Sequence, residues 1–231
     1  MRTAALLSLI LLAAPAGAIA KSPVLVELFT AQGCGGCRDA NAYLGKLADR
    51  AGVLALTYSV DYWDYLGWTD TFARPEYAER QRAYVQRLKL REPYTPQVVI
   101  DGGQEVQGLK TAEVDRLVRA AADAPWNPPD IRFVGRHRVD VGSGRVARGG
   151  ADVWLIRYDP RDAETVVKAG DNRGETVVQT NVVRQIKRLG TWRGRPHAYR
   201  VPAAPEDGLR TVVIVQAPHG GKVLGLAQAK S

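Results

Sequence analysis

The chain has 231 residues and a formal net charge of +8, with 32 basic against 24 acidic side chains. Its hydrophobic fraction of 45% is that of an ordinary globular protein. The basic residues are scattered apart from a concentration at positions 80–91, and no nucleic-acid-binding motif accompanies them, so we expect no nucleic-acid partner. The concentration indicates a solvated helix face, with an anionic partner or a membrane surface as the lesser alternative.

Residues 1–20 have the layout of a secretory signal peptide. Arg2 precedes an apolar run over residues 4–14, and small residues then lead to Ala20. Because the run is shorter than the roughly 20 residues of a membrane-spanning helix, we predict cleavage after Ala20 and no stable membrane insertion. The mature protein is then expected to be periplasmic or secreted, in an oxidising compartment where a disulfide persists.

Two cysteines, Cys34 and Cys37, follow an apolar run at residues 24–29. This run predicts a buried strand, and the helical spacing of apolar residues between positions 40 and 51 predicts a helix that already contains Cys37. Cys34 would lie at the helix start, where unpaired amides and the helix dipole favour the nucleophilic thiolate. Cys37, one turn further on, would be close enough to form a disulfide with it. We therefore predict a redox-active Cys34–Cys37 disulfide and no other cofactor.

Apolar periodicity and flanking glycine or proline predict the next elements. They are a strand at 53–60, a helix from 75 to about 90, strands at 97–100 and 105–107, and a helix at 111–124. The first two strands of the chain should be parallel, and the last two should form an antiparallel hairpin.

This order of elements resembles the thioredoxin superfamily, together with the Cys-x-x-Cys pair after the first strand and Thr95-Pro96 before the third. The resemblance covers residues 24–124 and implies a cis Thr95–Pro96 peptide opposite the cysteines. It also implies that Thr95 and Pro96 hold a substrate strand. One departure from thioredoxin is the dipeptide Gly35-Gly36 between the cysteines, which indicates a more flexible pair.

Longer stretches resemble a family of secreted bacterial thioredoxin-like proteins classified as a domain of unknown function. These stretches are residues 26–34, 61–64, 66–68 and 94–97. The family extends over nearly the whole mature chain. It implies a fold and a location but no substrate.

Asp61, Trp63 and Trp68 lie in a loop after the second predicted strand. Open parallel sheets build their sites at the carboxyl ends of strands, so these residues are candidates for a substrate-binding wall beside the cysteines. Equally, the indoles could cover an edge of the core while the aspartate caps a turn.

Glu27 lies near the position of the buried acid in thioredoxin's first strand. By that resemblance it is a candidate catalytic base that takes a proton from Cys37. The alternative is a carboxylate at the sheet surface, paired with an arginine. A Cys–His pair is not expected, because His137, His197 and His219 all lie in the second half of the chain.

Residues 125–130 contain three prolines and are predicted to be a linker. Beyond it, the chain holds runs rich in β-branched residues, separated by glycine, proline or aspartate turns and without helical periodicity. The runs are 131–141, 151–158, 163–168, 175–188, 197–201, 210–216 and 221–227. We therefore predict an α/β thioredoxin-like domain at residues 21–124, followed by an all-β antiparallel sandwich-like domain at residues 131–231.

Three functions fit these features. The leading one is a periplasmic thiol–disulfide oxidoreductase acting on protein thiols or disulfides, in which Cys34 attacks and Cys37 resolves the mixed disulfide. This function requires an accessible Cys34 sulfur. The second is a redox-inactive secreted binding module with a structural disulfide. The third is a metal (copper) carrier, ranked last because two thiolates alone make an incomplete site.

Overall fold

The computed structural model describes residues 22–230, so the predicted signal peptide lies outside the described residues. The first half contains the predicted elements in the predicted order, and it adds a short 3-10 helix in the predicted loop after the second strand. They are β1 (Val24–Thr30), α1 (Cys37–Ala48), β2 (Val53–Ser59), the 3-10 helix η1 (Asp64–Leu66), α2 (Pro75–Arg87), β3 (Gln97–Ile100), β4 (Gln104–Gln107) and α3 (Thr111–Asp123). Within residues 22–230, no helix combines the length and the apolar character that crossing a bilayer requires.

The second half of the described chain forms strands, as its composition predicts. They are β5 (Ile131–Val134), β6 (Arg138–Val141), β7 (Ala151–Asp159), β8 (Ala163–Val166), β9 (Thr176–Gln179), β10 (Val182–Trp192), β11 (His197–Arg200), β12 (Arg210–Gln216) and β13 (Val223–Gln228). Two predicted runs each form two strands. Residues 131–141 turn at Gly135, and residues 175–188 divide at Asn181, which has a left-handed φ of 50°.

Eight strands from both halves form one sheet, in the order β13-β12-β7-β10-β2-β1-β3-β4. As predicted, β1 and β2 are parallel, and β3 and β4 are antiparallel. The halves meet where β10 runs parallel to β2, with Val182 opposite Thr57. Asn181 strengthens this junction, because its carbonyl accepts from the Thr57 N–H at 3.1 Å and its Nδ2 donates to the Ala55 carbonyl at 2.9 Å. The second half is therefore not a separate sandwich, since its largest sheet continues that of the first half.

Helices cover both faces of the β1–β4 end of the sheet, and side chains that alternate in direction along β1 enter two different cores. Val24, Val26 and Leu28 of β1 belong to a core with apolar side chains of α1 and α3. Leu25 and Phe29 face the other way, into a core with Tyr77 and Tyr84 of α2.

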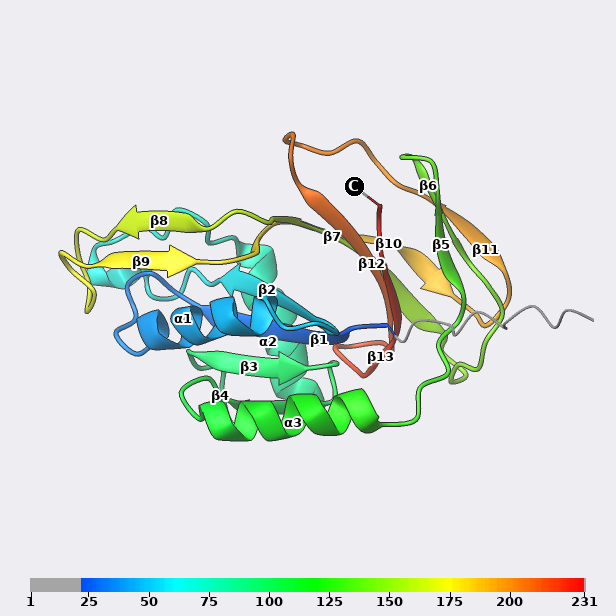
Figure 1. Ribbon diagram of the computed structural model, residues 1–231, viewed down its shortest axis with the longest axis horizontal. Coiled ribbons are helices and arrows are strands. Elements are labelled where there is room, and N and C mark those ends of the chain that lie inside the picture. The colour runs from blue at the N-terminus through cyan, green and yellow to red at the C-terminus, as the bar shows by residue number, and fades with distance from the viewer. Residues whose placement is uncertain (1–21, 231) are drawn as a thin grey trace, which may run out of the picture.

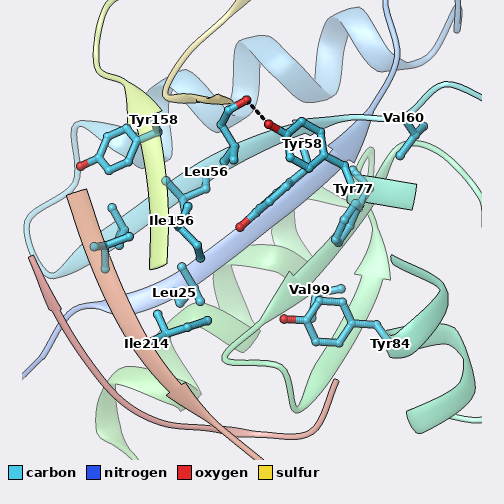
Figure 2. Close-up of a cluster of buried hydrophobic side chains, with 14 of the residues drawn as sticks. Leu25, Leu56, Tyr58, Val60, Tyr77, Tyr84, Val99, Ile156, Tyr158 and Ile214 are labelled. Atoms are coloured by element: carbon cyan, nitrogen blue, oxygen red, sulfur yellow. Dashed lines mark hydrogen bonds between the residues drawn. The ribbon is translucent and has the colours of Figure 1, made fainter. Parts of the chain in front are cut away.

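The same α2-side core continues into the second half of the chain. Figure 2 shows Leu25 and Leu56 of the first two strands close to Ile156 of β7 and Ile214 of β12. Burial of apolar side chains therefore stabilises the two halves together.

A three-stranded sheet, β11-β6-β5, encloses a third core at the far end of the large sheet. Trp192 is fully buried there, and its Nε1 donates to the carbonyls of Gly142 and Arg195, both at 3.0 Å. This core lies between the small antiparallel sheet and strands β7, β10 and β12 of the large sheet, which is shared with the first half.

The β8–β9 hairpin comes from the second half of the chain but lies beside the first. Figure 1 shows this yellow hairpin next to α1, far from the other strands that follow residue 130. Its position brings the loop at residues 167–175, which joins β8 to β9, to the start of α1.

Candidate functional site

Cys34 and Cys37 form a disulfide at the start of α1, with an S–S distance of 2.18 Å and Cα atoms 5.4 Å apart. The helix begins at Cys37, and the Cys37 N–H donates to the Cys34 carbonyl at 3.1 Å. Cys34 therefore lies one turn before the helix. This places its sulfur near the N-terminal end of the helix, as the spacing predicts.

Thr95 and Pro96 lie against the cysteine pair. The Thr95–Pro96 peptide is cis, which confirms what the thioredoxin resemblance implies. The Thr95 hydroxyl lies 3.3 Å from Cys34 Sγ in donating geometry. On the other side, a Cβ added to Gly36 would lie 3.8 Å from Pro96 Cδ and only 3.3 Å from Leu109 Cδ1. A side chain at position 36 would therefore crowd the site.

Trp63 is the predicted wall residue that comes closest to the cysteines. Its Nε1 donates to Thr95 Oγ1 at 2.7 Å. Two consecutive hydrogen bonds therefore link Trp63 through Thr95 to the Cys34 sulfur. Tyr65 stacks on Trp63 with ring centroids 6.3 Å apart, and Tyr65 is 78% exposed.

The other two wall candidates lie further away. Trp68 donates to Gln32 Oε1 at 2.9 Å and so contacts the side chain of the residue two positions before Cys34. Asp61 is half-buried, and its carbonyl accepts from the Asp64 N–H at 3.1 Å. Within residues 22–230, no hydrogen bond or ion pair joins Asp61 to either cysteine.

Cys34 is almost wholly buried, contrary to the prediction that its sulfur is accessible. Cys34 is only 3% exposed and Cys37 is fully buried. This burial was not predictable from the local pattern, because a segment that packs on the backbone around Cys34 lies more than 130 residues further along the chain.

That covering segment is the loop at residues 167–175, which packs on the backbone around Cys34. The Asp171 N–H donates to the Gly33 carbonyl at 3.1 Å. Asn172, itself 5% exposed, donates from Nδ2 to the carbonyls of Gln32 (2.9 Å) and Cys34 (2.8 Å). These bonds satisfy carbonyl groups that would otherwise need water, so the loop fits the cysteine segment closely.

An ion pair and a close backbone contact complete this cover. Arg38, in the first turn of α1, pairs with Glu175 at 2.5 Å. A Cβ added to Gly170 would lie 3.0 Å from the Gly33 carbonyl oxygen, and Gly170 has a left-handed φ of 81°. Only glycine suits this conformation and this approach.

Gln32 is a site residue that the sequence reasoning missed. It is fully buried, and its Nε2 lies 2.8 Å from Thr71 Oγ1, 3.3 Å from Thr165 Oγ1 and 3.1 Å from Gln179 Oε1. Its backbone N–H donates to Asp70 Oδ2 at 2.7 Å. Since Thr165 and Gln179 belong to β8 and β9, Gln32 connects the cysteine segment to the hairpin. Gln32 lies in the turn between β1 and the cysteines, and its polar side chain so close to Cys34 was the available signal.

Glu27 is paired with an arginine, but in the core and not at the surface. Its carboxylate accepts two hydrogen bonds from Arg80, at 2.7 and 3.1 Å, and one from the Tyr84 hydroxyl. Glu27 is fully buried on the α2 side of β1. None of its hydrogen bonds goes to Cys37, so we do not assign Glu27 the role of base for that thiol.

Burial sets the protonation of two groups in this part of the molecule. It raises the pKa of Tyr84 well above its usual value, against an opposing effect of Arg80, so the phenol stays protonated and can donate to Glu27. Burial also raises the pKa of Asp70, while hydrogen bonds from the backbone N–H groups of Gln32 and Phe72 act against the rise.

Other parts of the described chain offer no clear addition to the cysteine site. Within residues 22–230, no group of three or more histidine, cysteine, aspartate or glutamate side chains could hold a metal ion. A cavity of about 270 Å³ lies between α2 and the sheet, away from the cysteines, with Glu79, Trp154, Ile186 and His219 among its lining residues.

Comparisons with known proteins give matches that include both the cysteine pair and the β8–β9 hairpin. The model of a family described as "protein of unknown function (DUF1223)" matches residues 25–216. A crystal structure of protein AGR_C_4864 from Agrobacterium tumefaciens is similar to this chain, with a TM-score of 0.73 and 29% sequence identity. The similarity spans 90% of this chain and 94% of that one. A search of curated proteins found no match.

Proposed function

The chain belongs to this family of proteins of unknown function (DUF1223), and we propose that it is a thiol–disulfide oxidoreductase acting on protein thiols or disulfides through Cys34 and Cys37. One observation carries the proposal. A Cys-x-x-Cys disulfide lies at the start of a helix, and the hydroxyl of Thr95 lies 3.3 Å from Cys34 Sγ.

The architecture of the first half supports a thioredoxin-like assignment for residues 21–124. Its order β1-α1-β2-α2-β3-β4-α3 places the cysteines between the first strand and the first helix, with Thr95 and Pro96 just before β3. In this assignment Thr95 and Pro96 receive the substrate strand, and Trp63 supports Thr95 through its indole N–H.

The short spacing of the cysteines also argues for a redox role. A disulfide stabilises a fold mainly by closing a loop in the unfolded chain. For a loop of only four residues this effect is about 2 kcal/mol, against about 5 kcal/mol for a loop of about 100 residues. A pair three positions apart is therefore a weak structural crosslink, which favours a redox role over a structural one.

In the oxidising direction, the reaction transfers two electrons from a substrate dithiol to the cysteine pair. A substrate thiolate attacks Cys34 Sγ, the Cys34–Cys37 bond breaks, and Cys37 leaves as a thiolate that takes up a proton. The second substrate thiolate then attacks the substrate sulfur of the mixed disulfide and releases Cys34 as a thiolate. The substrate leaves as a disulfide, and the reverse sequence reduces a substrate disulfide.

Exchange requires the loop at residues 167–175 to move away from the cysteines. A substrate sulfur must reach Cys34, which is 3% exposed while the loop is in place. The contacts to be broken are the hydrogen bonds of Asp171 and Asn172 and the exposed Arg38–Glu175 ion pair. Exposed ion pairs contribute little stability, so opening at this edge is feasible without unfolding the core.

We place the protein in the periplasm or outside the cell. The predicted signal peptide at residues 1–20 supports this location, and an oxidising compartment would keep the pair available as a disulfide.

Single-cysteine variants test the proposal. Cys34→Ser should abolish insulin reduction and disulfide transfer to a reduced, unfolded substrate. Cys37→Ser should instead accumulate mixed disulfides with substrates, because Cys34 can still react but cannot be released. An unchanged rate in Cys34→Ser would contradict the proposed function.

A second candidate is a binding module in which the disulfide is only structural. The burial of Cys34 favours this candidate. The two functions differ in the stability of the disulfide, because structural disulfides resist reduction down to potentials below about −300 mV.

A further inference from the structure

The loop at residues 167–175 brings a carboxylate to the peptide between the two cysteines. Asp171 Oδ2 accepts a hydrogen bond from the Gly35 N–H at 3.4 Å. A Cβ added to Gly35 would lie 3.2 Å from Asp171 Cβ, so the approach depends on the missing side chain of Gly35. The Asp171 N–H also donates to the Gly33 carbonyl, which fixes the loop from the other side.

The other charged groups near this position have partners or lie further along the helix. Arg38 is held by Glu175, and the carboxylate of Asp70 accepts from the Gln32 N–H. Asp39 lies in the first turn of α1. Among the residues that the structure describes, no ion pair joins Asp171 to a basic side chain.

A carboxylate at this position acts against the reduced form of the pair. Reduction leaves a thiolate on Cys34, and free amides at the start of a helix stabilise such a thiolate. Asp171 occupies one of the nearby amides, and its charge repels the thiolate. Both effects favour the disulfide.

We propose that Asp171 is a redox-tuning residue, with which the loop at residues 167–175 holds the Cys34–Cys37 pair in its disulfide form. This inference rests on the proposed thiol–disulfide function and adds to it a regulatory contact from the second half of the chain. Movement of the loop away from Gly35 then does two things at once. It uncovers Cys34, and it makes the pair easier to reduce.

Equilibration of the full mature chain with glutathione tests this proposal. Two glutathione molecules supply two electrons and become one glutathione disulfide, Cys37 takes up one proton, and the other proton goes to the buffer. In Asp171→Asn, which keeps the size of the side chain and an acceptor oxygen, we expect the equilibrium constant for reduction to rise severalfold, by up to about tenfold. A tenfold rise corresponds to about 30 mV in potential.

Two further measurements separate charge from structure. The thiolate pKa of Cys34, followed by ultraviolet absorbance of the reduced protein, should fall in Asp171→Asn. The difference in this pKa between Asp171→Asn and wild type should shrink at 1 M salt, because charges are then screened within about 3 Å. Glu164→Gln is the matched control, because it removes an exposed charge from β8 of the same hairpin and should leave both quantities unchanged.

An equilibrium constant that is unchanged or lower in Asp171→Asn overturns the tuning role, whatever the activity of the wild type. If glutathione cannot reduce the wild type, dithiothreitol buffers extend the titration, and a wild-type disulfide that stays intact below about −300 mV means that the proposed function fails instead. The same comparison in dithiothreitol buffers then decides on Asp171.

Discussion

A few buried polar side chains organise the cysteine segment, and Gln32 is the foremost of them. One amide group connects the segment to Thr71, to β8 and to β9, while its carbonyl oxygen accepts from Trp68. Polar groups in such networks are costly to bury unless they are satisfied. The network therefore fixes one arrangement of the hairpin relative to Cys34.

At the same scale, Glu27→Gln is expected to weaken the fold without altering the redox chemistry. Removing one partner leaves the buried Arg80 charge uncompensated, which costs about 3–5 kcal/mol. Urea unfolding should reveal this loss, whereas Asp130→Asn, in an exposed pair, should change stability much less. A normal stability together with a slower reduction of the disulfide would instead favour the base role that we set aside.

From the raised pKa of Asp70 we predict a specific dependence of folding stability on pH. Burial raises its pKa in the folded state, so the folded protein holds this proton more tightly than the unfolded chain does. The stabilisation from this bound proton is fully present below the pKa of Asp70 in the unfolded chain. It is lost as pH rises through the higher pKa of Asp70 in the folded protein. The stability of wild type relative to Asp70→Asn should therefore decline between pH 3 and pH 7 in denaturant unfolding experiments. A constant or growing difference would contradict this account.

At the scale of elements, the β8–β9 hairpin places its connecting loop on the cysteine segment. Its sequence predicted only strands, because two short runs of β-branched residues carry no information about which distant segment they cover. The role of the two glycines between the cysteines was likewise not predictable from the sequence alone. The sequence indicated flexibility, whereas the structure uses Gly35 and Gly36 for the close approach of Asp171 and Leu109.

The hairpin should open more readily once Asn172 is replaced. Asn172→Ala removes both hydrogen bonds to the carbonyls of Gln32 and Cys34. We expect dithiothreitol to reduce the disulfide severalfold faster in this variant, as followed by the rate of thiol appearance. Arg173→Ala, an exposed neighbour in the same loop, is the control and should react like wild type. Equal rates in Asn172→Ala and wild type would show that the loop does not limit access.

Local patterns predicted most elements of the first half within a few residues. The reason is that helical and strand periodicities are set by nearby residues, as for α1 behind the cysteines. The burial of Cys34 and the pairing of Glu27 with Arg80 depend instead on long-range packing. These features of the candidate site were not predictable from the local pattern.

At the scale of the whole molecule, the two halves share a sheet and a core. The parallel contact between β10 and β2 is short, but Asn181 and Thr57 reinforce it, and Ile156 and Ile214 extend the core around Leu25. The proline-containing segment at residues 125–130 marked a change in composition. It did not mark a boundary in the hydrogen-bonded structure.

The mature chain should accordingly unfold in a single cooperative transition. A fragment ending at residue 124 would expose the apolar side chains of Leu25, Leu56 and Tyr58 that the second half covers, so we expect it to lack a cooperative unfolding transition. Calorimetry of both proteins checks this expectation. Two separate transitions in the full chain, or a stably folded fragment, would support independent domains.

The equilibrium redox potential of the Cys34–Cys37 pair tests the central claim most directly. A potential above about −300 mV, with full and reversible reduction by glutathione or dithiothreitol buffers, is the result expected of an oxidoreductase. A disulfide that remains intact at potentials below about −300 mV would contradict the claim and would identify the pair as a structural crosslink.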